Sequence, residues 1–324
     1  MRAALLRCCI AAVLQCGIAT TAFGAERYAL VVTGASGGEV YAKKYDAWRQ
    51  EFVNTLRDTF GYAQDHVFVL SESARDNTQK STRENVQRVL TDLRQRLTKD
   101  DQLIVLLIGH GTSMDGEDAK FNLVGPDLSA TEWTELVRPL AGRLVFVNTS
   151  SASFPFLHKL AGKGRIVLTA TDSSAQQFET VFPEFFIKSL TDPEADLDKN
   201  GRVSVWEAFS YASAAVQRAF QEKGQLPTER PLLDDTGAGI GREAQNPGSD
   251  GAVAKITYLQ PDAPIALPSD SALADLFKRR ADLESQVEAL KARKDTMPTE
   301  QYETELERLL IEIARVSAQI RTKS

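Results

Sequence analysis

Short apolar runs alternate with amphipathic segments over the first two thirds of the chain. The apolar runs have the length of buried strands, and the segments between them repeat apolar residues at helical spacing. This pattern predicts strands over 27–35, 66–70, 102–108, 143–151 and 165–171, and helices over 40–60, 81–97, 129–139, 154–160, 182–190 and 205–222. Strands that alternate with helices favour right-handed crossovers between parallel neighbours. We therefore expect an α/β fold, a three-layer sandwich with a mainly parallel sheet.

Local signals add detail to this pattern. Ser81 before Glu84, and Ser129 before Glu132, are capping-box sequences that begin helices. The polar stretch 112–127 is typical of a loop, with a short hairpin arm over 121–124. Residues 225–250 are rich in Gly, Pro and Asp and predict an irregular loop, and 253–259 has the pattern of a last, edge strand.

The last quarter of the chain changes character. Residues 261–268 contain three prolines and predict a linker, here taken as 261–270. Beyond it, charged helical sequence spaces its apolar residues by four and three, with Pro298 starting a second helix. We expect an α-helical hairpin or short coiled coil over 271–324, which packs on its own chain, forms a homodimer or binds a partner helix.

The first 25 residues have the organisation of a secretory signal peptide. Arg2 and Arg7 precede an apolar stretch over 8–18, and the small residues Ala22, Gly24 and Ala25 follow. A membrane anchor is the alternative, but the apolar part is shorter than the roughly 20 residues that a spanning helix needs. We therefore expect a secreted or periplasmic protein whose mature domain, 26–260, carries no membrane span.

Composition limits the chemistry of that mature domain. The 324-residue chain has a formal net charge of −6 and a pI near 5.3, which argues against a nucleic-acid partner. All three cysteines, Cys8, Cys9 and Cys16, lie in the signal segment. The mature protein therefore has no disulfide, no zinc–thiolate site and no cysteine nucleophile.

Two predicted strands end in residues that can do chemistry. His110 follows the strand in QLIVLLIGHG (102–111), and Ser150 follows the strand in RLVFVNTSS (143–151). In open α/β sheets, ligands bind at the carboxyl ends of the strands. If the two strands are neighbours, a base and a hydroxyl meet at one edge. The alternative is that His110 only caps a strand and Ser150 only bonds nearby backbone. His66 and His158 have the pattern of surface residues.

These strand ends resemble those of the caspase and legumain superfamily of cysteine peptidases, the caspase-hemoglobinase fold. The resemblance rests on His110–Gly111 after one buried strand and on Asn148–Thr149–Ser150 at the end of the next, and it covers roughly 27–241. It implies a caspase-like sheet, His110 as base or acid, Ser150 at the nucleophile position, and an oxyanion hole from the N–H groups of Gly111 and residue 150. The chain departs from the family because Ser150 replaces the nucleophilic cysteine.

This replacement leaves two functions open. A serine hydroxyl must lose its proton as it attacks, so it needs a base in a tight hydrogen bond. A thiolate is already deprotonated and needs no such base. One hypothesis is a pseudoenzyme that binds a peptide or protein ligand without cutting it. The other is an active endopeptidase that uses Ser150 with His110, in which Asp115, Glu117 or Asp118 could orient the histidine. A purely structural role is a third. By position alone, Asp172 and Arg230 are candidates for a specificity pocket.

A second motif predicts a metal site. Residues 196–207 match the twelve-residue EF-hand loop, in which side-chain and backbone oxygens surround a hard cation. The expected Ca²⁺ ligands are Asp196, Asp198, Asn200, the carbonyl of Arg202, Ser204 and Glu207, with Gly201 at the sharp turn. The alternative is an acidic turn that only caps the next helix. Because TDPEA before the loop is a poor helix, we expect a lone site that stiffens the fold.

Overall fold

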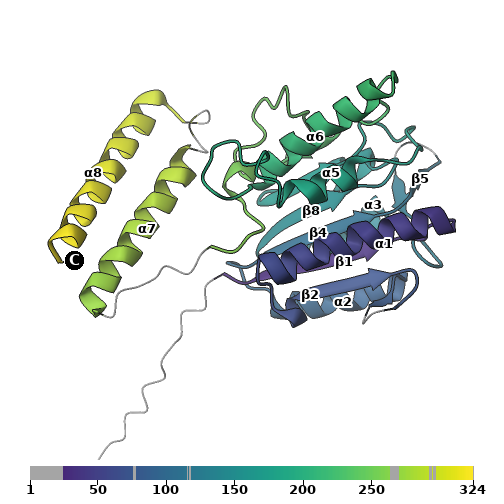
Figure 1. Ribbon diagram of the computed structural model, residues 1–324, viewed down its shortest axis with the longest axis horizontal. Coiled ribbons are helices and arrows are strands. Elements are labelled where there is room, and N and C mark those ends of the chain that lie inside the picture. The colour runs from purple at the N-terminus through teal and green to yellow at the C-terminus, as the bar shows by residue number, and fades with distance from the viewer. Residues whose placement is uncertain are drawn as a thin grey trace, which may run out of the picture.

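A computed structural model of the chain describes residues 25–75, 78–114, 116, 118–262, 270–291, 294 and 297–323. Its main element is a seven-stranded sheet in the order β10-β9-β8-β4-β1-β2-β3 (Figure 1). All neighbouring strands are parallel except β10 and β9, which are antiparallel. The strands are β1 (Arg27–Thr33), β2 (Val67–Ser71), β3 (Gln79–Lys80), β4 (Gln102–Ile108), β8 (Arg143–Asn148), β9 (Arg165–Thr169) and β10 (Leu232–Asp234).

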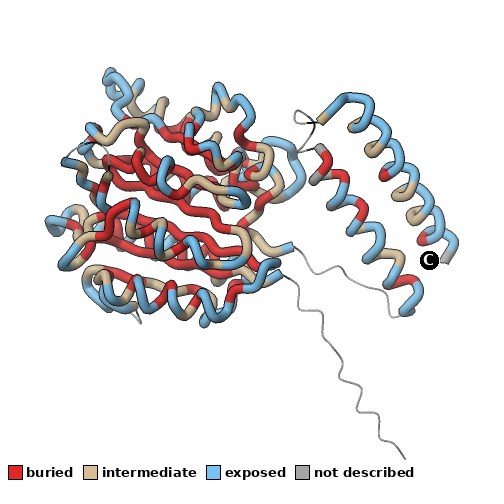
Figure 2. Tube along the Cα trace, turned by 180° about the vertical axis from the view of Figure 1, so that it is seen from behind, coloured by how far each residue is buried: buried red, intermediate tan, exposed pale blue. Residues whose placement is uncertain are grey.

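Helices cover both faces of this sheet, so the predicted three-layer α/β sandwich is confirmed. One face packs against α1 (Glu39–Asn54), α5 (Phe182–Ser189) and α6 (Val205–Glu222), and the other against α2 (Arg83–Arg96), α3 (Ala130–Val137) and α4 (Phe154–Leu160). Every residue of β4 is buried, with alternate side chains in the two apolar layers. Figure 2 shows the buried sheet between helices whose outer surfaces are exposed.

The first residues of α2 and α3 show whether the predicted capping boxes form. Ser129 and Glu132 form the predicted capping box at the start of α3. The box predicted at Ser81 is wrong, because the side chain that caps α2 is that of Thr82. Ser81 instead lies directly after β3, and its N–H donates to the Ser71 carbonyl. A π-helical turn, η1 (Thr55–Thr59), continues α1, and a 3₁₀ turn, η2 (Gln64–His66), precedes β2.

Two loop predictions also change. Residues 111–129 form a small antiparallel sheet of β5 (Gly111–Ser113), β6 (Ala119–Phe121) and β7 (Leu128–Ser129). The arm expected at 121–124 overlaps its middle strand only at Phe121, because the strand begins and ends earlier than predicted. The antiparallel edge strand is β10, inside the predicted irregular loop. Residues 253–259 contain the 3₁₀ turn η3 (Ala254–Ile256) in place of a strand.

Asp235 explains why the chain turns at η3. Its buried carboxylate accepts hydrogen bonds from the N–H groups of Gly251, Val253 and Ala254, each at 2.8 Å. Three donors that converge on one side chain require a tightly turned backbone, which an extended strand cannot provide. The Asp235 carboxylate, directly after β10, therefore fixes the turn at η3.

The C-terminal helices are α7 (Ser271–Lys291) and α8 (Thr299–Lys323), which pack together as the predicted hairpin. Their shared core consists of Leu283, Val287, Leu290 and Leu309. The signal peptide predicted over 1–25 and the linker predicted over 261–270 lie almost entirely outside the described residues. Within the described ranges, no helix is both long enough and apolar enough to cross a lipid bilayer.

Candidate functional site

The two candidate strand ends lie side by side. Strand β4 pairs in parallel with β8, with Leu107 opposite Asn148 in the register. His110 and Ser150 each follow the last residue of their strand by two positions, so both lie at the carboxyl edge of the sheet. This is the edge at which open α/β sheets bind ligands. The adjacency that the sequence analysis required is therefore present.

Helix α1 holds the ring of His110. The Tyr45 hydroxyl lies 3.1 Å from Nε2 and 3.4 Å from Nδ1, and the Ser36 carbonyl oxygen lies 3.1 Å from Nε2. A carbonyl only accepts, so the Ser36 contact requires a hydrogen on Nε2. Burial raises the pKa of Tyr45 above its ordinary range, which keeps this phenol protonated. His110 is thus bonded to α1 and to the turn after β1.

The hydroxyl of Ser150 has different partners. Ser150 is fully buried, and its Oγ donates to Asn148 Oδ1 at 2.7 Å and lies 3.2 Å from the Ser151 carbonyl oxygen. The N–H of Ser150 donates to the same Asn148 oxygen at 3.0 Å, which is an Asx turn. No hydrogen bond joins Ser150 to His110 in the part of the chain that the structure describes. A serine nucleophile needs its base within roughly 2.6–3.2 Å, so the catalytic pair is not assembled.

The predicted oxyanion hole is not formed in this arrangement. The N–H of Gly111 donates to Ser151 Oγ at 3.1 Å, and that hydroxyl donates back to the Gly111 carbonyl at 3.0 Å. The Ser150 N–H donates to the Asn148 side-chain oxygen. Both donors therefore have acceptors inside the protein. A glycine is needed at position 111 because a Cβ there would lie 2.2 Å from the Ser151 carbonyl oxygen and 2.8 Å from Ser150 Oγ.

A narrow cleft opens on the α1 side of the same edge. It is lined by Thr33, Gly34, Ser36, Ala42, Tyr45, Asp46, Glu72 and Ser73. Two of these residues, Ser36 and Tyr45, are the ones that bond His110. The cleft therefore offers backbone and carboxylate groups beside the half-buried imidazole. Near Ser150, the fully buried side-chain nitrogen of Asn148 has no hydrogen-bond partner among the described residues.

The loops next to β9 and β10 supply further charged groups. Asp172 and Arg230, proposed from position alone, form an ion pair at 3.3 Å. Sequence reasoning missed Glu229, a buried carboxyl that accepts hydrogen bonds from the N–H groups of Val181 and Phe182 at the start of α5, at 2.6 and 3.0 Å. Burial raises its pKa to about 7. A lone glutamate in a polar segment carries no sequence signal for such a role.

The EF-hand-type loop brings its carboxylates together. Oxygens of Asp196, Asp198 and Glu207 lie within 4.8 Å of one another. The N–H groups of Asn200 and Gly201 donate to Asp196, and Gly201 has a φ of 85°, so the loop curls around its acidic side chains. The pKa of Asp198 is raised, first by partial removal of its carboxyl from water and then by the charges of Glu207 and Asp196.

The donor set suits a hard cation. Carboxylate, amide, hydroxyl and backbone carbonyl oxygens are the ligands of Ca²⁺, and softer metals favour nitrogen or sulfur. Glu207 now accepts hydrogen bonds from the N–H groups of Leu197 and Asp198 through one oxygen and from Ser204 through the other. Ser204 and Glu207 also form a capping box at the start of α6. Ser204 and Glu207 therefore belong both to the helix cap and to the expected set of metal ligands.

Residues 257–258 pair with the chain where the loop enters α6. Ser204 forms an antiparallel bridge with Tyr258, and the Val205 N–H donates to the Thr257 carbonyl at 2.8 Å. The Tyr258 hydroxyl accepts from Asn200 Nδ2 at 3.1 Å. On the entering side, α5 ends at Ser189, several residues before the loop, so the loop has no helix directly in front of it, as predicted.

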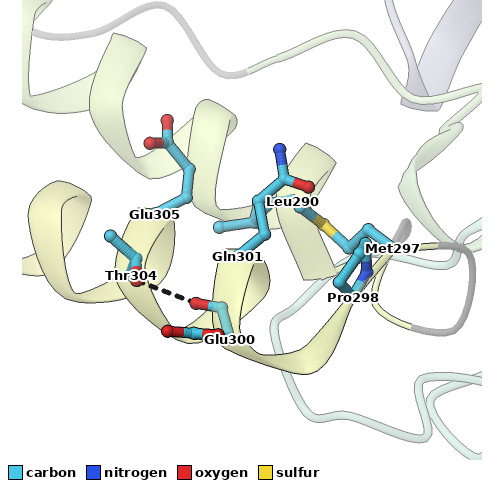
Figure 3. Close-up of a pocket in the computed structure, with 7 residues that line it drawn as sticks. All are labelled: Leu290, Met297, Pro298, Glu300, Gln301, Thr304 and Glu305. Atoms are coloured by element: carbon cyan, nitrogen blue, oxygen red, sulfur yellow. Dashed lines mark hydrogen bonds between the residues drawn. The ribbon is translucent and has the colours of Figure 1, made fainter.

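A larger hollow lies at the turn between α7 and α8 (Figure 3). Its walls come from Leu290, Met297, Pro298, Glu300, Gln301, Thr304 and Glu305. The Thr304 hydroxyl donates to the Glu300 carbonyl, as the dashed line in Figure 3 shows. Among the residues that the structure describes, these walls contain no histidine.

Comparisons with known proteins give little beyond this geometry. No protein-family model matches the chain, and neither does any curated protein. Among solved structures, the chain is similar to that of protein GSU0716 from Geobacter sulfurreducens, at 15% sequence identity and a TM-score of 0.43. The match covers 64% of this chain and 92% of that one. At this level the similarity has no bearing on function.

Proposed function

We propose that this protein is an exported, caspase-like pseudoenzyme that binds a peptide or protein segment beside His110 and Ser150 without cutting it. We further propose that residues 196–207 bind Ca²⁺ and that the C-terminal hairpin recruits a second copy or a partner helix. The observation that carries the proposal is the state of Ser150, whose buried hydroxyl donates to the amide oxygen of Asn148. An amide oxygen is not a base.

The absence of cleavage has a chemical reason. To act as a nucleophile, Ser150 would have to leave Asn148 and find a base, while His110 would have to leave Tyr45 and Ser36. Each broken hydrogen bond costs on the order of 1 kcal/mol, and the buried groups left behind cost more. The N–H groups of Gly111 and Ser150 would also need release before they could stabilise an oxyanion. Endopeptidase activity remains the alternative, supported by the adjacency of the two strand ends.

Peptide binding is supported by the cleft next to His110. The cleft is small, about 30 Å³, so we place in it one small polar group of the ligand, beside the hydrogen-bonding groups of β1 and α1. A test is to fill it from the helix side with Ala42→Trp, which we expect to abolish capture of ligands from an immobilised peptide library. Lys43→Trp is the matched control, because Lys43 is exposed and does not line the cleft. Equal binding by both variants would contradict the proposed location.

Calcium has a structural role in this proposal. A bound Ca²⁺ would offset most of the charge of three neighbouring carboxylates and fix the start of α6, where the Val205 N–H also bonds to Thr257. Lone sites of this kind in extracellular modules bind at roughly 10⁻⁴–10⁻³ M. Isothermal titration of the folded mature chain with Ca²⁺ should therefore give an affinity in that range. An absence of binding at millimolar Ca²⁺ would leave residues 196–207 as a helix cap.

The catalytic part of the proposal is tested by labelling and turnover. We expect the folded, calcium-loaded protein to be unreactive toward a fluorophosphonate probe and to cleave no member of a peptide library. Ser150→Cys should not create activity, because the new thiol would remain buried against Asn148 and apart from His110. Cleavage that disappears in Ser150→Ala would overturn the proposal and establish the endopeptidase.

A further inference from the structure

Helix α8 carries two parallel rows of residues with the same spacing. The first row packs against α7 and consists of Tyr302, Leu306, Leu309, Ile313, Val316 and Ile320. The second row is displaced by one position and consists of Glu303, Glu307, Leu310, Ala314, Ser317 and Arg321. Spacings of four and three keep each row on one face of a helix. Apart from the half-buried Ser317, the second row is exposed, and the side chain of Leu310 makes it partly apolar.

The charges of the second row differ from those of Arg308 and its partners. Arg308 pairs with both Glu305 and Glu312, and Arg279 also reaches Glu312. In contrast, Glu303, Glu307 and Arg321 take part in no ion pair with any residue that the structure describes. Two acids thus lie unpaired at the amino end of the row and one base at its carboxyl end. Segregated charges of this kind favour a partner with the opposite order.

The second row supplies that opposite order itself. When the helix is reversed about position 312, Glu303 exchanges with Arg321, Glu307 with Ser317, and Leu310 with Ala314. Two copies of α8 packed antiparallel would therefore place an acid against a base, a carboxylate against a hydroxyl, and a large apolar side chain against a small one. A parallel pair would place Glu303 against Glu303 and Arg321 against Arg321, which is unfavourable.

We propose that the second row of α8 is a homodimer interface, in which two copies of this chain pack antiparallel about a two-fold axis near residue 312. A two-fold interface uses the same patch on both copies, so every contact occurs twice. The inference starts from the part of the proposed function that concerns the hairpin. It selects a second copy of the chain over a different partner helix. It does not depend on the metal site or on Ser150.

Analytical ultracentrifugation of the mature full-length chain tests this interface by charge exchange. Native protein should be a dimer at micromolar concentration. Glu303→Arg alone, or Arg321→Glu alone, should weaken the dimer by about tenfold or more, because two attractive pairs become two repulsive ones. The double variant with both changes should recover the native affinity. An equimolar mixture of the two single variants should form heterodimers. One variant then has basic residues at both positions and the other has acidic residues at both.

Two further variants separate this interface from others. Leu310→Glu should give a monomer with unchanged helical circular dichroism. Arg280→Glu makes the same charge change on α7, where Arg280 pairs with Glu284 of its own helix, and should leave the dimer intact. A native protein that stays monomeric, or a dimer that resists Leu310→Glu and both charge reversals, would overturn the inference. Calcium titration and peptide cleavage are measured separately, so these outcomes bear on the hairpin alone and leave the proposed peptide-binding and metal sites untouched.

Discussion

The sheet edge and the EF-hand-type loop both carry predicted sites, but they assemble differently. At the edge, two neighbouring strands bring His110 and Ser150 together, yet each side chain bonds to another group. In the loop, three carboxylates converge within 4.8 Å. A strand end fixes where a residue lies along the backbone, whereas a twelve-residue loop also fixes where its side chains point. Local spacing therefore predicted the relative positions of side chains better than the adjacency of two strands did.

The sharpest test of the loop is the removal of Glu207. Glu207→Gln loses one carboxylate oxygen from the expected bidentate ligand, and we expect Ca²⁺ affinity to fall by about a hundredfold or more. Isothermal titration calorimetry measures this change. Glu222→Gln, at the exposed end of the same helix, is the control and should bind as the native protein does. If Glu207→Gln kept native affinity, the carboxylates would not form the site.

Packing at the edge is tested by Gly111→Ala. The added Cβ would lie 2.2 Å from the Ser151 carbonyl oxygen, so the two strand ends would have to separate. We expect the free energy of unfolding to fall by roughly 3 kcal/mol, as in other overpacked sites, when measured by urea denaturation. Gly38→Ala is the control, because a Cβ there meets nothing within 4 Å. A stable Gly111→Ala protein would mean that the edge is looser than the contacts indicate.

The pH dependence of stability tests the buried carboxyl of Glu229. Its pKa is raised from 4.5 to about 7 by burial, so the folded protein holds this proton over a range in which the unfolded chain loses it. The resulting stability is complete below about pH 4.5 and is lost as the pH rises to about 7, by roughly 3 kcal/mol. Urea denaturation between pH 4 and 8 should show this loss in the native protein. Glu229→Gln should lack that part of the slope, and identical slopes would contradict the assignment.

The smallest expected effect concerns Ser150 itself. Ser150→Ala removes the hydrogen bond to Asn148 and leaves a buried acceptor short of a donor, which should cost about 1 kcal/mol of unfolding free energy. Ser271→Ala, at an exposed position, serves as the control for the loss of a hydroxyl. A larger loss, accompanied by loss of activity, would indicate a catalytic serine.

The sequence predicted the sheet well where strands are long and apolar. Strand β4 and its neighbours were placed correctly because a run such as Leu103–Ile108 has few other stable environments. Strand β10 was missed because it has three residues inside a polar loop, and its place depends on pairing with β9. The turn at η3 depends on Asp235, which contacts residues 16 to 19 positions away.

The sequence predicted where the backbone places the site residues but not which groups their side chains contact. The sequence indicates that His110 and Ser150 share one edge, but their partners come from Tyr45 on α1 and from the Asx turn at Asn148. The second of these had a local signal, because asparagine two residues before a serine can accept from its N–H and hydroxyl. Glu229 and the cleft beside His110 depend on tertiary packing, which no local pattern specifies.

The central claim is that His110 and Ser150 are neighbours without being partners. Nitrogen NMR of the histidine ring tests it directly, since the chain contains three histidines and only His110 lies at this edge. We predict that Ser150→Ala leaves both ring-nitrogen resonances of His110 unchanged, whereas Tyr45→Phe shifts them. Resonances that shift in Ser150→Ala and stay in place in Tyr45→Phe would contradict the account and restore the catalytic pair.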